Sequence, residues 1–133
     1  MYFCSTPKYI NVVAKAIENV GSWGEETARK FLESKGYTIL EQNWRCLHKE
    51  VDIIAKLQNT IVFAEVKTRT SKFRSPIDAV DRQKQKLLIS AANYYVRQKN
   101  LDCDIRFDII SIVVSNGSVD LEHIENAFYP RVR

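Results

Sequence analysis

The stretch that decides the fold is residues 50–67, EVDIIAKLQNTIVFAEVK. Residues 51–57 and 61–66 are both rich in apolar and β-branched side chains, which is typical of two buried strands. The polar step between them, residues 58–60, is short enough for a hairpin loop. The sequence therefore predicts a central β-hairpin.

Charged residues interrupt this hairpin where a buried sheet should exclude them. Because side chains alternate along a strand, Glu65 and Lys67 share one face of the second strand with its apolar residues. By the same rule, Asp52 shares one face of the first strand with Glu50 and Ile54. If the two faces coincide, Asp52, Glu65 and Lys67 meet in one patch.

Such a patch has a chemical explanation. An unpaired buried carboxylate costs several kcal/mol or more, and two adjacent carboxylates repel each other. Mg²⁺ relieves both problems, because it binds one or two protein carboxylates and fills its shell with water and phosphate oxygens. Lys67 would then orient a water or stabilise charge on a phosphoryl group. The alternative is an ordinary Glu–Lys pair on a solvated hairpin rim, and these residues alone leave both interpretations open.

Length and composition predict one globular domain. The chain has 133 residues, of which 45% are apolar and 27% charged. No stretch approaches the roughly 20 apolar residues of a membrane span, and the first residues lack the pattern of a signal peptide. The three cysteines have no metal-ligand spacing, which favours reduced thiols in the cytoplasm. We therefore expect a cytoplasmic protein without a membrane partner.

Positive charge is concentrated between Lys67 and Lys99. This segment has nine Lys or Arg against two acids, a net charge of +7 in a chain whose total is +4. Lys and Arg at phosphates supply most non-specific nucleic-acid affinity, so the pattern points to a polyanionic partner. A solvated helix face would give some of the same pattern, and charge alone leaves both interpretations open. Within the segment, Arg69, Lys72 and Arg74 lie in a predicted polar loop and are candidate phosphate contacts.

Helical spacing and stop signals predict three helices. They are residues 6–21, residues 22–35 with Gly36 as the stop, and residues 77–99. The first helix carries no obvious chemistry. Further strands are expected at residues 38–45, 105–114 and 119–124, and His123 is interpreted as a structural or surface residue.

Two charged residues lie on the apolar stripes of the second and third helices. Glu25 has the capping-box spacing from Ser22, and it equally could reach a metal held by the sheet, so both roles stay open. Its neighbour Glu26 is expected to be solvated. Lys84 falls between Val80 and Leu87 on the stripe of the third helix, and we expect it to point into the site rather than snorkel outward.

Short motifs occur in a fixed order between Gly24 and Phe128. They are Gly24-Glu25-x-x-Ala28, Gly36-Tyr37-x-Ile39-Leu40-x-x-Asn43, Glu50-Val51-Asp52-x-Ile54-Ala55, Val62-Phe63-Ala64-Glu65-Val66-Lys67-Thr68-Arg69, Ala79-Val80 with Lys84, Arg106-Phe107-Asp108 and His123-Ile124-x-Asn126-Ala127-Phe128. Together they resemble the YraN-like family, an uncharacterised bacterial family placed among the restriction-endonuclease-like PD-(D/E)XK nucleases, near archaeal Holliday-junction resolvases.

The resemblance implies an α/β fold with a restriction-endonuclease-like αβββαβ core, in which helices flank a mixed central sheet. The core would span residues 22–128 of a single domain, residues 1–133, with residues 1–21 as an extra N-terminal helix. By analogy with the resolvases, the resemblance also implies a homodimer.

The site residues that the resemblance implies are Glu25, Asp52, Glu65 and Lys67, with Mg²⁺ or Mn²⁺ as the metal. We therefore expect a metal-dependent endonuclease that hydrolyses DNA phosphodiesters, including those of branched or junction DNA. Asp52 and Glu65 would hold the metal with help from Glu25 and the Val66 carbonyl. Lys67 would activate water, and Lys84 with the basic loop would grip phosphates. The alternative is a non-catalytic nucleic-acid-binding or adaptor protein that keeps the fold.

Overall fold

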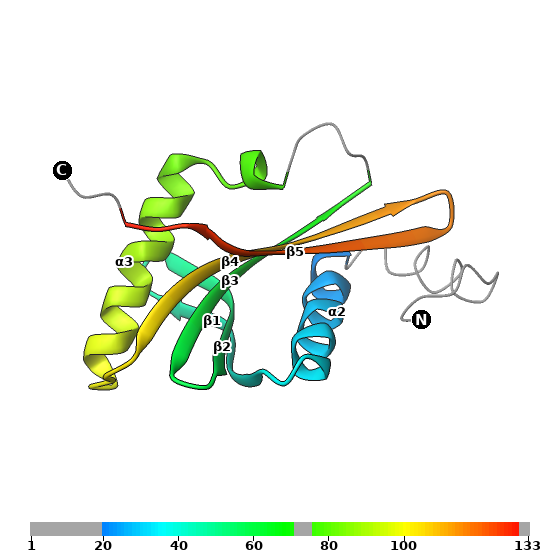
Figure 1. Cartoon of the computed structure of the whole chain (residues 1–133). Helices are drawn as coiled ribbons and strands as arrows, with labels where there is room; N and C mark the ends of the chain where they lie inside the picture. Colours follow the sequence, from blue (N-terminus) through cyan, green and yellow to red (C-terminus); the bar gives the residue numbers. More distant parts are fainter. Residues whose placement is uncertain (1–19, 71–75, 131–133) are drawn as a thin grey trace.

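The computed structural model describes residues 20–70 and 76–130 (Figure 1). Its elements are helix α2 (Val20–Ser34), strands β1 (Thr38–Cys46), β2 (Lys49–Leu57) and β3 (Thr60–Arg69), the 3₁₀ helix η2 (Ile77–Ala79), helix α3 (Arg82–Gln98), and strands β4 (Asp104–Ser115) and β5 (Ser118–Phe128). This order confirms the predicted α/β class and is consistent with a restriction-endonuclease-like core. The helix predicted for residues 6–21 lies outside the described residues except for its last two, which begin α2. Lys72 and Arg74 also lie outside them.

The five strands form one mixed sheet in the order β1-β2-β3-β4-β5. Strands β3 and β4 are parallel, and every other neighbouring pair is antiparallel. A parallel pair needs a long crossover, and α3 lies in the connection between β3 and β4. The central hairpin is confirmed, with a turn of two residues, Gln58 and Asn59, because Thr60 already pairs with Leu57.

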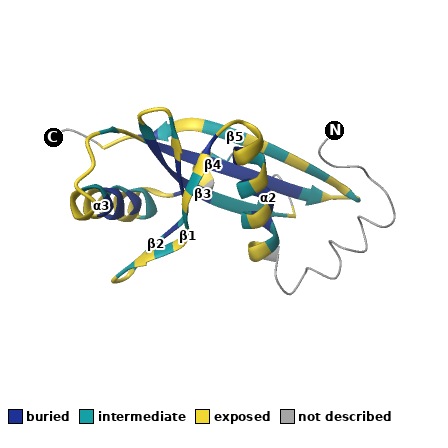
Figure 2. Ribbon diagram, turned by 90° about the horizontal axis from the view of Figure 1, so that it is seen from below, coloured by how far each residue is buried: buried dark blue, intermediate teal, exposed yellow. Residues whose placement is uncertain are grey.

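The sheet has a core on each face, and each core is closed by one helix. On one face, Leu88 and Tyr95 of α3 pack with Ile54 and Phe63 of the hairpin. On the other face, residues of α2, including Leu32, pack with the alternate residues of the same strands. Strand β4 is buried along most of its length, as Figure 2 shows. The period of two in β3 therefore directs its odd residues to α3 and its even residues to α2.

The helix starts differ from the predictions. Helix α2 already includes Ser22, so Ser22 is not its N-cap and the capping-box interpretation of Glu25 is wrong. Helix α3 begins only at Arg82, because the Asp81 carboxylate accepts a hydrogen bond of 2.8 Å from the backbone N–H of Lys84 and caps it there. The predicted first turns of that helix, from Ile77, are the separate η2.

The apolar stripe predicted for α3 faces the core, with the exception of one residue. Leu88, Ala91, Ala92 and Tyr95 are buried, whereas Leu87 is exposed. Adjacent residues lie about 100° apart around a helix, so Leu87 falls at the edge of the buried stripe, where its side chain stays partly in solvent.

Asp108 of β4 is buried on the α2 face of the sheet, and both of its carboxylate oxygens have hydrogen-bond partners. Arg106 donates to both of its carboxylate oxygens, at 2.9 and 2.8 Å. His123 Nε2 lies 2.7 Å from Oδ2, and the backbone N–H of Asn126 donates to Oδ1 at 3.0 Å. Burial raises the pKa of Asp108, but these hydrogen bonds outweigh it and hold the pKa below its ordinary value. His123 therefore has a structural role, which is one of the two roles expected for it.

Strand β5 extends past the predicted end at residue 124 and reaches Phe128, whose ring stacks on that of Phe107 at 5.1 Å. Within residues 20–70 and 76–130, neither helix combines the length and the apolar content needed to cross a bilayer.

Candidate functional site

Asp52 lies where β2 leaves β3. The last pair between the two strands is Ile53 with Ala64. Beyond it, the Asp52 carboxylate, rather than the β2 backbone, hydrogen-bonds to the backbone of β3. The N–H of Val66 donates to Asp52 Oδ2 at 2.8 Å. The alternation expected for β2 breaks here, because Val51 and Ile54, three positions apart, pack in the same core cluster. The strand-face argument thus fails for β2 in detail, although Asp52 still reaches Glu65.

Glu65 of β3 is a buried acid with one oxygen that no described residue satisfies. Its side chain is only 4% exposed. Its Oε2 lies 3.6 Å from Lys84 Nζ and 3.8 Å from Lys67 Nζ, so both lysines act on it through charge rather than through a close hydrogen bond. Its Oε1 is buried and, among the described residues, has no hydrogen-bond partner. A buried carboxylate oxygen in this state is costly unless another ligand completes it.

Asp52 and Glu65 act on each other's pKa in opposite directions: Asp52 raises the pKa of Glu65, whereas a side-chain hydrogen bond from Glu65 lowers that of Asp52. Burial and then the charge of Asp52 raise the pKa of Glu65 to about 7, and Lys84 and Lys67 only partly oppose this. Burial also raises the pKa of Asp52 above its ordinary value, against the hydrogen bond from the Val66 N–H. The pair therefore shares a position where one proton or one cation is strongly preferred over two bare negative charges.

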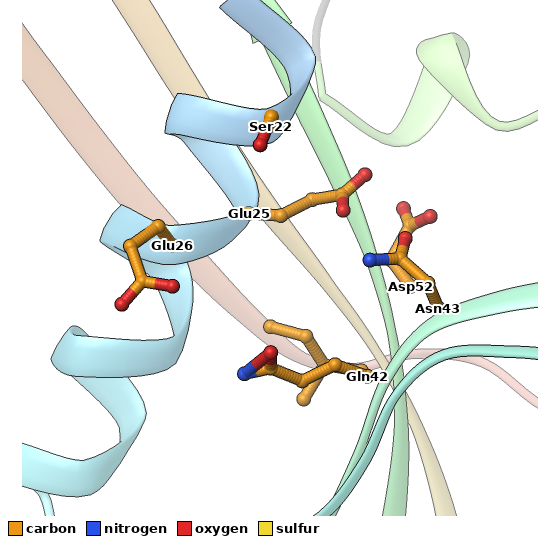
Figure 3. A pocket seen from close by; sticks show the side chains of 7 residues that line it. Ser22, Glu25, Glu26, Gln42, Asn43 and Asp52 are labelled. Carbon is orange, nitrogen blue, oxygen red and sulfur yellow. The ribbon is translucent and has the colours of Figure 1, made fainter.

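Helix α2 brings a third carboxylate to this edge of the sheet. Glu25 and Asp52 line one pocket with Gln42 and Asn43 of β1, and Figure 3 shows the Glu25 carboxylate directed toward Asp52 and Asn43. Partial burial and the charge of Asp52 raise the pKa of Glu25, and a hydrogen bond from the Asn43 side chain opposes the rise. Glu26 lines the outer part of the same pocket and pairs with Arg29, as expected for a solvated residue.

A glycine allows α2 to come this close. A Cβ built on Gly24 would stand 1.9 Å from Thr68 Oγ1 of β3, so any larger residue would push the helix or the strand away. Asn43 also has an unusual backbone, with φ +49°, which turns its side chain within β1. Sequence reasoning gave neither residue a role. The signal available for Asn43 was its residue type, because Asn tolerates this conformation better than other residues in a strand.

The predicted basic residues divide into two groups. Lys84 and Lys67 converge on Glu65, from α3 and β3 respectively. Arg69 instead donates from Nη2 to Ser111 Oγ of β4 at 3.3 Å. The structure therefore brings Asp52, Glu65 and the two lysines together, with Glu25 on the far side of Asp52.

The donor set suits a divalent cation of the Mg²⁺ type. A buried carboxylate with one oxygen lacking a partner in the described part of the chain, Glu65, and the half-buried carboxylate of Asp52 match an ion that takes one or two protein carboxylates and otherwise binds water and phosphate. Within residues 20–70 and 76–130, no three His, Cys, Asp or Glu side chains already lie close enough to hold a metal alone. Glu25 thus lines the approach without forming a closed three-ligand cage.

Comparison with known proteins places the chain among uncharacterised relatives. Residues 24–112 match the family described as "Uncharacterised protein family UPF0102". A UPF0102 protein of Flavobacterium psychrophilum is 46% identical over 112 residues, which cover 84% of this chain and 94% of the relative. One of Caldicellulosiruptor saccharolyticus is 50% identical over 113 residues, covering 82% and 96%. One of Bacteroides thetaiotaomicron is 43% identical over 112 residues, covering 84% and 93%. These matches confirm the resemblance found from the motifs.

Proposed function

We propose that this protein, which belongs to the uncharacterised protein family UPF0102, is a metal-dependent nuclease that hydrolyses phosphodiester bonds, with DNA as its substrate. The observation that carries the proposal is Glu65. It is a buried carboxylate with one oxygen that lacks a partner among the described residues, beside the half-buried carboxylate of Asp52 and within 4 Å of two lysines. A purely structural acid would have its oxygens satisfied, as buried polar groups normally are.

Asp52 and Glu65 would hold Mg²⁺ or Mn²⁺. Glu25 and the Val66 carbonyl would be available as further ligands of the ion, directly or through water. When bound, the ion would supply positive charge at the scissile phosphate and lower the pKa of a bound water. Asp52 is fixed for this role by the Val66 N–H. Lys67, 38% exposed and beside Glu65, would orient the attacking water or bind a phosphoryl oxygen from the open side.

The surroundings of the site suit a polyanion. Helix α3 carries four Lys or Arg and no acid from Arg82 to Gln98, and Lys84 of this helix already points at Glu65. Backbone phosphates are bound by such residues without regard to sequence. Arg69, Lys72 and Arg74 remain predicted phosphate contacts on the connection between β3 and α3.

The second candidate is a nucleic-acid-binding protein of the same fold that does not cleave. The observation that favours it is the lack, in the described part of the chain, of a group of three ligands ready for a metal. The two functions differ in metal affinity, because only the nuclease requires Mn²⁺ to bind through Asp52 and Glu65.

The test is a cleavage assay with Mg²⁺ or Mn²⁺ on single-stranded, duplex, flap and four-way-junction DNA, and on RNA. Asp52→Ala and Lys67→Ala should each lower the rate by about 100-fold or more, while salt-sensitive DNA binding persists. Lys56→Ala serves as the matched control, because Lys56 is an exposed lysine farther along β2. Undiminished hydrolysis by both site variants would refute the assignment. Binding without any cleavage, and without Mn²⁺ affinity in a calorimetric titration, would support the second candidate.

A further inference from the structure

Two aromatic side chains form an exposed surface beside the site. Trp44 of β1 and Tyr94 of α3 have ring centroids 6.2 Å apart and ring planes inclined by 37°. Tyr94 is 46% exposed, and Trp44 is half-buried. The buried Tyr95 supports Trp44 from below in an edge-to-face contact at 5.2 Å. We call Trp44 and Tyr94 the aromatic shelf; its base is rigid because Tyr95 belongs to the core.

The shelf lies on the same face of the sheet as Glu65. The Tyr95 ring contacts that of Phe63 at 5.8 Å, and Phe63 lies two residues before Glu65 on the same strand. Trp44 pairs with Val51, which directly precedes Asp52. Along α3, Tyr94 follows Lys84 by ten residues, a rise of about 15 Å along the helix axis. This distance corresponds to a few nucleotides of an extended strand.

The charge around the shelf identifies the chemistry of its partner. Helix α3 has four cations and no acid, and Lys99 Nζ lies 5.6 Å from the centre of the Tyr95 ring. Glu41, which accepts a hydrogen bond from the Tyr95 hydroxyl at 3.4 Å, is the acid in contact with the shelf's base. A second copy of the chain that met the shelf through its own shelf, about a two-fold axis, would bring an equally basic helix to the same place and be repelled. A polyanion with exposed aromatic faces is attracted instead.

We propose that the aromatic shelf stacks an unpaired nucleobase, so that the preferred ligand is a nucleic acid with a single-stranded segment next to the phosphate held at the site. This inference rests on the proposed function for the identity of the ligand. Bases within a blunt duplex are already stacked on each other and cannot reach the shelf. An unpaired base presents a free face, and stacking on an aromatic side chain contributes about 1–3 kcal/mol per base.

The experiment measures binding in EDTA, where no hydrolysis occurs. Trp44 fluorescence in a Trp23→Phe background reports stacking, and the anisotropy of a dye on the nucleic acid reports affinity, during titration with a ten-nucleotide single strand, a blunt duplex, and the same duplex with a single-stranded tail. Tyr94→Ala and Tyr94→Phe are compared with Tyr129→Ala, the matched control, because Tyr129 is 69% exposed and follows β5, so it belongs to neither of the shelf's two elements. Analytical ultracentrifugation of the same variants reports self-association.

The single strand and the tailed duplex should quench Trp44, and the blunt duplex should not. Tyr94→Ala should weaken binding of the two quenching ligands by about five-fold or more, whereas Tyr94→Phe and Tyr129→Ala should bind like the parent. If Tyr94→Ala leaves all affinities unchanged, weakens all three equally, or changes only self-association, the shelf inference is overturned while the nuclease proposal stands. If the parent protein binds no nucleic acid at all, the proposed function fails and this inference fails with it.

Discussion

The sheet buries two carboxylates on opposite faces, and their hydrogen-bond partners and the directions of their pKa shifts differ. Asp108 pairs in register with Ala64 and faces α2, whereas Glu65, the next residue of β3, faces α3. Asp108 receives hydrogen bonds from Arg106, His123 and a backbone N–H, and its pKa is lowered. Glu65 has two lysines at 3.6 and 3.8 Å, one oxygen without a partner among the described residues, and a pKa raised to about 7.

The difference separates a charge that is built into the fold from one that is kept available. Hydrogen-bond donors that satisfy a buried carboxylate hold it in one arrangement, and removal of the carboxylate leaves those donors without an acceptor. A buried carboxylate without such partners contributes little to stability but binds a proton or a cation readily. The burial of the two residues alone would not distinguish them, because both are almost completely enclosed.

The largest effect is expected from Asp108→Ala. The change leaves the Arg106 guanidinium and the Asn126 N–H without their acceptor in a buried place, which should lower the free energy of unfolding by about 3–5 kcal/mol. Urea unfolding at pH 7.5, followed by circular dichroism, measures it. A loss below about 1 kcal/mol would remove the structural half of the comparison.

In the absence of divalent ions, Glu65→Gln should raise the free energy of unfolding, whereas Asp108→Ala lowers it. The folded-state pKa of about 7 lies above the ordinary 4.5, so the folded chain holds a proton that the unfolded chain releases. The stabilisation from this proton is complete below pH 4.5 and is lost as the pH rises through 7. Glutamine does not ionise, so the variant should gain roughly 3 kcal/mol over the wild type by pH 8 and little at pH 4.5.

Urea unfolding in EDTA at pH 4.5, 6 and 8 measures this gain. The lowered pKa of Asp108 places its own titration below its ordinary 3.8, so it does not vary across this window. An equal effect of Glu65→Gln at all three pH values would contradict the raised pKa. Added Mn²⁺ should stabilise the wild type and not the variant, because the ion replaces the proton at Glu65.

The sequence was sufficient to predict the hairpin, the class of fold and the face of β3 that carries Glu65 and Lys67. These features follow from apolar runs and from the period of two in β3, which extends undisturbed to Lys67. The family motifs added Glu25. In each case the signal is local, or is a spacing that a single strand or helix preserves.

The satisfied carboxylate could not be predicted in the same way. The partners of Asp108 come from Arg106, His123 and Asn126, and the β4–β5 register shifts next to Asp108. Such a bulge depends on the pairing of two strands and leaves no periodic signal. The approach of Gly24 to Thr68 was likewise invisible, because it depends on how a helix lies against a strand 44 positions farther along the chain.

That approach provides the third prediction. Alanine normally favours a helix interior over glycine by about 1 kcal/mol, yet at Gly24 its Cβ would overlap Thr68 Oγ1. Gly24→Ala should therefore lower the free energy of unfolding by about 1–2 kcal/mol and weaken Mn²⁺ binding, since α2 carries Glu25. Thr68→Ala in the same chain should restore part of both.

Gly21→Ala is the matched control, because no atom lies within 4 Å of its added Cβ in the same helix. It should raise the free energy of unfolding by about 0.5–1 kcal/mol. Equal effects of the two alanines on stability and Mn²⁺ affinity would show that α2 does not need this contact to position Glu25.

The smallest effects are expected on the pKa of Glu65 itself, and they have opposite signs. Lys84 is the stronger of the two lysines that lower this pKa, so Lys84→Ala should raise it further, and Lys67→Ala should raise it less. Asp52→Asn removes a negative charge and should lower it. Carbon-detected NMR titration of the Glu65 carboxyl in EDTA measures all three, with the Asp108 carboxyl as an internal reference that should not move. If neither Lys84→Ala nor Asp52→Asn shifted this pKa, burial alone would set it, and Glu65 would not be the centre of a charged site.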